Sequence, residues 1–254
     1  MLWLWLFLAS LTATLLGWLK FLWFISLGYG LAVAAISATT LWLSASTAGT
    51  LSTLQLLLVL AYGVRLASFL FAREREPSFV GRTPAKNPPT DVAFTSRLLV
   101  WISVSLLYVA MVSPAVIASA SDAQGSVTQA LGLLVALVGL GVEALADQHK
   151  TSFKRTNPGT FCSDGLFSVV RFPSYLGEIV FWLGNFVAGV ASFSAWWHFA
   201  VSLCGLLTIV SIMLSSTKRL EASQAARFEG DVRFRTYVKT VPILVPGVPW
   251  FTMN

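Results

Sequence analysis

Three ionisable side chains fall inside long apolar runs of the sequence, where a charge is expensive. They are Arg65, Glu143 and Glu178. A charge at the centre of a bilayer costs roughly 2.5–3.5 kcal/mol on insertion scales, so each needs a partner or a watery cavity. All three are expected within about two helical turns of the cytosolic ends of their helices, where they could share one polar pocket. Alternatively, Arg65 could snorkel to the headgroups, and Glu143 could pair with it.

Glu178 belongs to a polar stripe on a predicted helix. Helical spacing places Glu178, Trp182 and Asn185 on one face, at positions i, i+4 and i+7. The face offers a carboxylate, an indole N–H and an amide, which a lipid-facing surface would not carry. This pattern favours the interior of a helix bundle or a ligand pocket.

The segment before this helix has the features of an anion site. Asn157-Pro158-Gly159 and Asp164-Gly165 are turn signals, and basic residues lie within or beside them. Pro173 stands where a helix would begin, which suits its fixed φ and missing N–H. A helix N-terminus near Lys and Arg binds phosphate or carboxylate well. An ordinary cytosolic loop rich in basic residues explains the same facts.

The cysteines and histidines do not form a recognisable metal motif. Cys162 and Cys204 are too few for a disulfide framework, and Cys204 lies in an apolar run. His149 and His198 are far apart in the sequence. No Cys/His cluster has the spacing of metal ligands, so the sequence predicts no metal site.

The elements that must position these residues are predicted to be membrane helices. The chain of 254 residues is 56% hydrophobic and 11% charged, with a mean hydropathy of +0.75. Soluble domains carry roughly 25% charged residues, so only a bilayer accommodates this composition. Although the pI is about 9.6, no basic groove with interleaved stacking residues appears, which argues against nucleic-acid binding.

Apolar runs of about 20 residues predict the spans. The sequence contains seven of them, so we expect an all-α polytopic membrane protein with about seven transmembrane helices, at 2–19, 21–43, 51–71, 98–119, 127–146, 175–191 and 195–215. Residues 2–19 are either a retained helix or the core of a signal peptide, although no basic segment precedes them. The Pro-rich stretch 77–91 is expected to be a surface loop, either a mobile lid or a plain connector.

Charge placement predicts the orientation. With seven spans, 16 of the 17 Lys and Arg residues fall in segments on one side, and the loops opposite contain none. By the positive-inside rule the N-terminus is lumenal or outside, and the C-terminus is cytosolic. The expected location is the endoplasmic reticulum membrane in a eukaryote or the inner membrane in a bacterium. Membrane lipids are therefore expected partners, and nothing in the sequence predicts the oligomeric state.

The last 110 residues, approximately, also resemble a known domain. Two segments carry the resemblance. The first contains Asn157-Pro158-Gly159, Gly165-Leu166-Phe167, the run Arg171–Glu178 and Trp182; the second contains Phe228–Asp231, Tyr237 and Val241-Pro242. Together they resemble the C-terminal domain of steroid 5-alpha-reductases and related membrane proteins. Seven spans with a lumenal N-terminus also fit that superfamily.

The resemblance implies NADPH as the cofactor. In the reductases, the positions matching Ser174, Tyr175 and Glu178 contact the nicotinamide end, and basic residues of the preceding loop and the tail hold the phosphates. On that basis the predicted cofactor-binding residues are Asn157, Ser174, Tyr175, Glu178, Lys154, Arg155, Arg171 and Arg235. The implied activity is reduction of a carbon–carbon double bond conjugated to a carbonyl in a steroid-like or other lipid-soluble substrate.

Two departures separate this chain from steroid reductases. Those enzymes polarise the ketone with a Glu and a Tyr of the N-terminal half, whereas the first four predicted spans contain no carboxylate. Tyr62 and Tyr108 are the phenols placed to substitute, and they are the candidate catalytic residues. The histidine-containing stretch before the tail motif is replaced by Lys218-Arg219-Leu220-Glu221.

Two alternatives remain. Isoprenylcysteine carboxyl methyltransferases share the superfamily layout and bind S-adenosylmethionine through an Arg-His-Pro-x-Tyr-x-Gly segment, in which this chain has Phe172 for His. Their tail carries a paired-Glu motif, of which only Glu221 is present. The third alternative is a non-catalytic membrane protein that retains the fold. For the reductase, we expect a substrate part at 1–146 and a cofactor part at 147–254.

Overall fold

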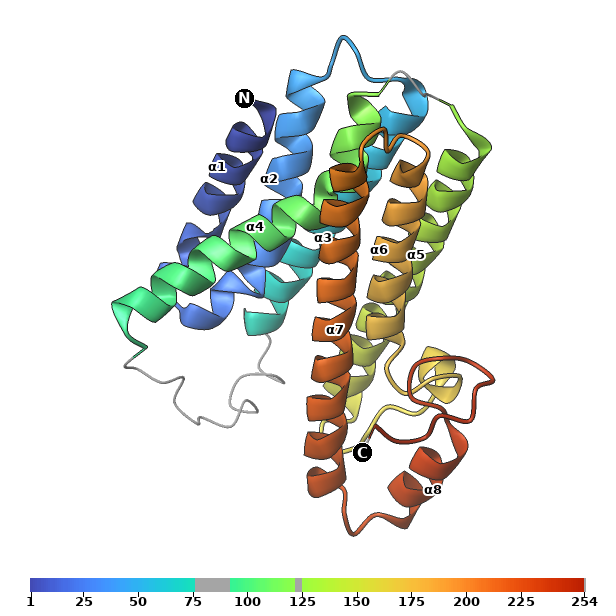
Figure 1. Cartoon of the computed structure of the whole chain (residues 1–254). Helices are drawn as coiled ribbons and strands as arrows, with labels where there is room; N and C mark the ends of the chain where they lie inside the picture. Colours follow the sequence, from blue (N-terminus) through green and yellow to red (C-terminus); the bar gives the residue numbers. More distant parts are fainter. Residues whose placement is uncertain (76–91, 122–124, 254) are drawn as a thin grey trace. The chain divides into compact units, whose positions relative to one another are not determined.

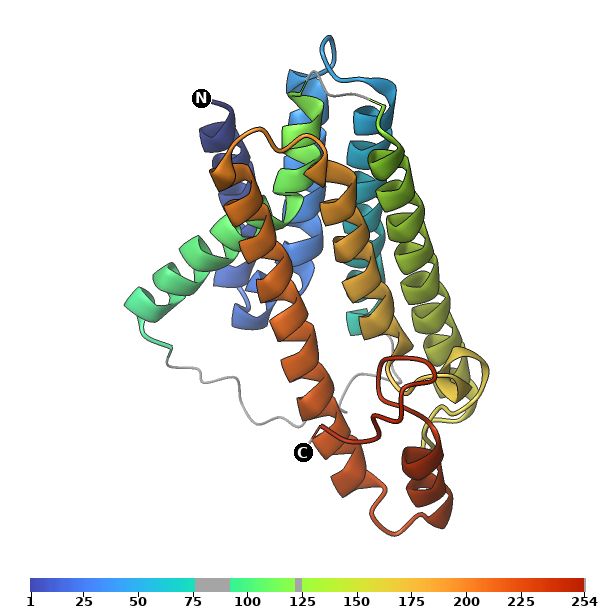
Figure 2. The same cartoon turned by 45° about the vertical axis from the view of Figure 1, so that its right-hand side comes forward.

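The computed structural model describes residues 1–75, 92–121 and 125–253. Every regular element in those ranges is a helix, as predicted. Arg82, Lys86 and the predicted lid or connector at 77–91 lie outside the described residues. Figures 1 and 2 show the chain in two views.

Eight α-helices and three short 3-10 helices follow one another along the described chain. The α-helices are α1 Leu2–Thr14, α2 Leu27–Leu43, α3 Thr50–Arg75, α4 Phe94–Ser119, α5 Val127–Thr156, α6 Pro173–Val190, α7 Trp196–Arg227 and α8 Val232–Thr240. The 3-10 helices are η1 Leu15–Trp18, η2 Phe21–Phe24 and η3 Gly165–Ser168.

These helices confirm the predicted polytopic membrane protein. By length and composition, five helical segments can each span a membrane: Phe21–Leu43, α3, α4, α5 and α7. The segment Leu2–Trp18 is a shorter apolar helix. The predicted sixth span, 175–191, coincides with α6, which carries the polar stripe of Glu178 and Asn185. The orientation still rests on the charge distribution.

The chain forms two compact units, each built from two stretches of sequence. Unit 1 comprises Met1–Leu134 and Gly184–Leu206, and unit 2 comprises Val135–Leu183 and Leu207–Asn254. The predicted functional division at residue 147 differs from this structural division, because α5, α6 and α7 each contribute residues to both units. Whether the substrate and cofactor parts divide at residue 147 stays a prediction.

Unit 1 is packed through small residues. Helices α2 and α3 run side by side in both views (Figures 1 and 2). A Cβ atom added to Gly30 would lie 2.7 Å from the Ala67 nitrogen, and one added to Gly63 would lie 2.6 Å from the Ala34 nitrogen. Glycine at these positions therefore lets the two backbones approach, as at many membrane helix interfaces.

The first helix is part of unit 1. Leu6, Ser10 and Thr14 of α1 are fully buried. The Ser10 hydroxyl donates to the Ser105 carbonyl at 3.1 Å, and the Thr14 and Ser105 hydroxyls lie 3.1 Å apart. Helix α1 thus packs against α4 through neutral hydrogen bonds.

Unit 2 is held together by a close helix pair and a returning tail. A Cβ on Gly177 of α6 would lie 2.6 Å from the Glu143 nitrogen of α5, so only glycine permits this approach. The segment just before α6 pairs with the tail: Arg171 N–H donates to the Pro242 carbonyl at 2.9 Å, and Phe172 N–H donates to Ile243 at 3.1 Å. Phe172, Ile243 and Leu244 form a buried apolar cluster there.

Candidate functional site

Buried charge marks unit 2 as the candidate site. Glu143, Arg171, Glu178 and Glu221 are all buried there. An ion removed from water is costly unless other groups compensate it, and intramembrane ionisable residues usually serve a function. Two of the three ionisable residues singled out in the sequence, Glu143 and Glu178, belong to this group.

Arg171 is the centre of an ion pair between distant segments. Its guanidinium donates to a Glu221 carboxylate oxygen at 2.8 Å, and the two side chains are 1% and 11% exposed. The same guanidinium donates to the Phe251 carbonyl, and the second Glu221 oxygen accepts from the Met253 N–H at 3.1 Å. These contacts fix the tail against the start of α6. Arg171 therefore has a structural partner, and its predicted phosphate contact stays a prediction.

The first turn of α6 carries two further predicted cofactor residues. The Ser174 hydroxyl donates to an Asp147 carboxylate oxygen of α5 at 2.8 Å. Tyr175 is half-buried, and its ring stacks on that of Phe172 with centroids 6.2 Å apart. Ser174 and Tyr175 are thus held in place from both sides, by α5 and by the residue before α6.

The polar stripe of α6 is buried, as its pattern predicted. Glu178 is 7% exposed, Trp182 2% and Asn185 1%. Asn185 lies in unit 1, where its side-chain oxygen accepts from Gln55 at 2.9 Å and its nitrogen donates to the Met111 carbonyl at 3.1 Å. Its role is to satisfy polar groups inside a helix bundle.

The remaining predicted cofactor residues lie on the surface of unit 2. Lys154 is half-buried, and its ammonium donates to the Thr160 carbonyl. Arg155 and Asn157 are exposed at the end of α5 and just beyond it, and Arg235 is exposed on α8. Unit 2 contains ten Lys and Arg residues and seven Asp and Glu residues. Its net charge is therefore positive, which favours a polyanionic ligand.

An aromatic cluster joins the loop after α5 to α8. The Phe161 ring lies 5.2 Å from Phe234 and 5.3 Å from Tyr237, measured between centroids. The Tyr237 hydroxyl donates to the Phe167 carbonyl at 2.7 Å. Burial raises the pKa of Tyr237 well above its ordinary value, so the phenol stays neutral and keeps donating. Both segments that carry the family resemblance thus meet within unit 2.

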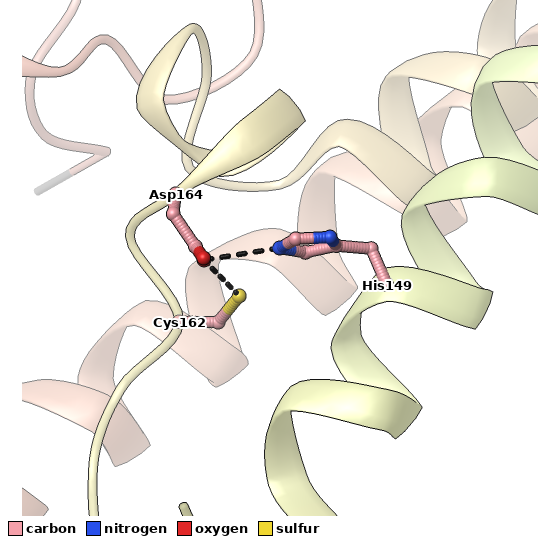
Figure 3. Close-up of side chains that lie close together, drawn as sticks. All are labelled: His149, Cys162 and Asp164. Carbon is pink, nitrogen blue, oxygen red and sulfur yellow. Dashed lines mark hydrogen bonds and ion pairs between the residues drawn. The ribbon is translucent and has the colours of Figure 1, made fainter.

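Three side chains that were not expected to meet converge on the loop after α5 (Figure 3). His149 Nε2 lies 3.0 Å from an Asp164 carboxylate oxygen, and Cys162 Sγ lies 3.4 Å from the same oxygen. The hydrogen bond from His149 holds the pKa of Asp164 below its usual value. Burial, followed by the hydrogen bond to Asp164, raises the pKa of Cys162 to about 12.

The candidate catalytic tyrosines lie in the core of unit 1. Tyr62 is fully buried, and its hydroxyl lies 3.1 Å from that of Tyr29. Tyr108 donates to the Phe24 carbonyl at 2.8 Å and stacks on Tyr29 with centroids 5.2 Å apart. The sequence analysis missed Tyr29, which lies between the other two. Its position in an apolar run, between Gly28 and Gly30, gave no signal for this contact.

Arg65 and a surface hollow also belong to unit 1. Arg65 is half-buried, and its guanidinium lies 5.5 Å from the centroid of the Phe69 ring, one helical turn further along α3. A hollow of about 340 Å³ is lined by Met1, Leu2, Trp5, Thr40, Leu43, Ser44, Thr47, Ser119 and Ala120. The hollow is apolar in character and contains none of the predicted site residues.

Comparison with known proteins places the chain in a family. A family model described as "Protein of unknown function (DUF1295)" matches residues 10–241, which include both segments of the candidate site except Pro242. No curated protein and no solved structure matches the chain. The match covers most of the sequence, and the chain therefore belongs to the DUF1295 family of membrane proteins.

Proposed function

We propose that this protein is a membrane-embedded reductase that uses NADPH to reduce a carbon–carbon double bond conjugated to a carbonyl in a lipid-soluble substrate. The observation that carries the proposal is the assembly of the two reductase-like segments. The segments 157–182 and 228–242 are distant in sequence, yet Arg171 N–H donates to Pro242 and Tyr237 donates to Phe167. Such pairing is what a shared cofactor site requires.

All eight predicted cofactor-binding residues fall within unit 2. Lys154, Arg155 and Arg235 lie at its surface, where a dinucleotide with its phosphates would meet water and cations together. Ser174 and Glu178 lie in the first two turns of α6, and Glu178 is buried. The residues therefore suit a ligand whose anionic end is solvated and whose ring end is enclosed.

The chemistry assigns separate tasks to cofactor and protein. Bound NADPH would supply a hydride to the β-carbon of the conjugated system, and a proton from an acid would complete the saturated product. The protein must orient the nicotinamide ring and exclude water from it. The buried Glu178 and the Ser174 hydroxyl, fixed by Asp147 at 2.8 Å, are the groups proposed to hold that ring.

A methyltransferase is the second candidate, and the buried carboxylates favour it. Glu143 and Glu178 lie on α5 and α6 within one compact unit, and both are buried. S-Adenosylmethionine carries a sulfonium cation, which carboxylates stabilise. The two candidates predict different cofactors, so a binding experiment separates them.

The test compares cofactors on full-length protein purified in detergent. NADPH and S-adenosylmethionine are titrated against the parent, against Glu178→Gln and Ser174→Ala, and against Glu74→Gln, which changes an exposed carboxylate of unit 1. We expect saturable NADPH binding that weakens at least about tenfold in the first two variants, equivalent to 1.4 kcal/mol. Glu74→Gln should bind like the parent.

Each other result has a defined meaning. Binding of S-adenosylmethionine alone would move the protein to the methyltransferases. Binding of neither cofactor by protein that elutes as a single folded species would overturn both and favour a non-catalytic role. NADPH binding that Glu178→Gln leaves unchanged would contradict the placement of the nicotinamide. With NADPH binding established, enone lipids are screened by NADPH oxidation.

A further inference from the structure

We propose that His149, Cys162 and Asp164 form a zinc site that fastens the loop after α5 to that helix. The site stands independently of the proposed reductase activity. The three side chains come from one compact unit, with His149 on α5 and the other two on the loop that follows it. Figure 3 shows them pointing toward a common centre.

The two hydrogen-bond distances in this cluster are close to those that a zinc ion imposes on its ligands. Zinc bonds of about 2.0–2.3 Å at tetrahedral angles hold neighbouring ligand atoms about 3.3–3.6 Å apart. His149 Nε2 and the Asp164 oxygen are 3.0 Å apart, Cys162 Sγ and that oxygen are 3.4 Å apart, and all three ligand atoms lie within 4.8 Å of one another. Small side-chain rotations would admit the ion.

The chemical types of the three ligand atoms favour zinc over calcium and magnesium. An imidazole nitrogen, a thiolate sulfur and a carboxylate oxygen are the three donors that zinc combines in proteins. Calcium and magnesium prefer oxygen ligands alone, so neither suits a site with Cys162. The Asp164 side chain is 62% exposed, which leaves room for a water molecule as the fourth ligand.

The backbone of the loop is shaped to hold the carboxylate against the imidazole. Gly165 has a φ of +55°, a conformation that side chains other than glycine rarely adopt. A Cβ at this position would lie 3.2 Å from His149 Cε1. His149 also stacks on the Phe167 ring, with centroids 6.2 Å apart. The turn that follows Asp164 is therefore fitted to the histidine.

The zinc ion would have a positional role. It would link the two ends of the segment between His149 and Cys162, and this segment carries Lys154, Arg155 and Asn157. Without it, the loop is joined to α5 at this point by the hydrogen bond between His149 and Asp164, and Asp164 is largely exposed. Metal binding to the folded chain would stabilise this part of unit 2 by mass action.

The experiment uses full-length protein in detergent, freed of metal with a chelator and titrated with Co²⁺ and then Zn²⁺. Cobalt bound by a thiolate gives a sulfur-to-metal charge-transfer band, which zinc then removes. We expect about one ion per chain, because three ligands at one point form one site. Even loss of an outer-shell partner weakens zinc binding about 10–100-fold, so Cys162→Ser and His149→Ala should weaken it about a hundredfold or more. Cys204→Ser and His198→Gln should bind as the parent does.

A second measurement keeps the test independent of how the variants fold. On the parent protein, zinc should slow alkylation of Cys162, located by peptide mass spectrometry, and leave the alkylation rate of Cys204 unchanged. Absence of the charge-transfer band in folded parent protein would overturn the proposal. Equal cobalt affinity in Cys162→Ser would overturn it too, as would an alkylation rate at Cys162 that zinc does not change.

Discussion

The two units of this protein bury different kinds of polar group. Among the described residues of unit 1 the buried polar side chains are all neutral, and they are Ser10, Thr14, Ser37, Thr40, Ser44, Ser52, Gln55, Ser105, Ser113, Ser119, Gln129, Asn185, Ser192 and Ser202. In unit 2 four of the five are ionisable, namely Glu143, Arg171, Glu178 and Glu221, with Thr217 as the fifth.

We interpret this difference as one between groups that support packing and groups that are candidates for function. Neutral hydroxyls and amides can satisfy one another or a backbone carbonyl inside a bilayer, as Ser113 and Ser202 do at 2.8 Å. Buried ions contribute little to stability over apolar residues of the same size, so their presence calls for another explanation. We therefore propose that the polar groups of unit 1 support the packing and that the buried carboxylates Glu143 and Glu178 of unit 2 serve ligand binding.

The largest effect is expected from breaking the buried ion pair of unit 2. Arg171→Ala leaves the Glu221 carboxylate buried without its cation and should cost about 3–5 kcal/mol of unfolding free energy, measured by denaturant titration in detergent. Arg233→Ala is the control, because Arg233 is 83% exposed beside Asp231. A surface pair contributes about 0–1 kcal/mol. Equal losses in the two variants would contradict the contrast.

Replacing a glycine at a close helix contact, in comparison, should lower the unfolding free energy by a similar amount in both units. In unit 1, a Cβ from Gly63→Ala would lie 2.6 Å from Ala34 N, and in unit 2 one from Gly177→Ala would lie 2.6 Å from Glu143 N. Each should lose about 1–3 kcal/mol by overpacking. Gly141→Ala in α5 meets nothing within 4 Å and should gain up to about 1 kcal/mol in helix propensity. Thermal unfolding of the three variants measures these stability changes. A Gly141→Ala variant less stable than the parent would contradict the prediction.

Tyr237 should make the stability of the folded protein depend on pH. Tyr237→Phe removes the hydrogen bond to Phe167 and should cost about 1 kcal/mol. Burial raises the pKa of Tyr237 in the folded state, so its contribution is complete below the unfolded pKa of about 10 and falls as the pH rises above it. Unfolding measured from pH 8 to 11 should therefore show an alkaline loss in the parent that is smaller in Tyr237→Phe. Identical pH profiles would contradict this assignment.

The smallest effect is expected from the neutral network of unit 1. The Gln55 amide donates to the Asn185 side chain at 2.9 Å. A double-mutant cycle with Gln55→Ala and Asn185→Ala should give a coupling of about 0.6 kcal/mol, typical of hydrogen bonds between membrane helices. A coupling as large as that between Arg171 and Glu221 would remove the energetic distinction between the units.

The helices could be predicted from the sequence because apolar runs and turn residues are local signals. The expected spans at 21–43 and 98–119 end at the same residues as the segments found, and Glu178, Trp182 and Asn185 are buried on their helix. These features depend only on hydropathy and on the helical repeat.

Contacts between distant segments could not be predicted. Arg171 and Glu221 are 50 residues apart, and no pattern links them. His149 and Cys162 do not have the spacing of a metal motif in the sequence, yet the loop after α5 brings their ligand atoms within 4.8 Å of each other. The return of the tail to Arg171 and Phe172 likewise follows from packing of Ile243 and Leu244, which local sequence does not encode.

Hydrogen–deuterium exchange of the full-length protein, with and without saturating NADPH, tests the central claim most directly. The account predicts slower exchange at 157–182 and 228–244, in unit 2, and unchanged exchange along α3 of unit 1. Protection of α3 without protection of the unit 2 segments, or no protection anywhere in folded protein, would contradict the assignment of ligand binding to unit 2.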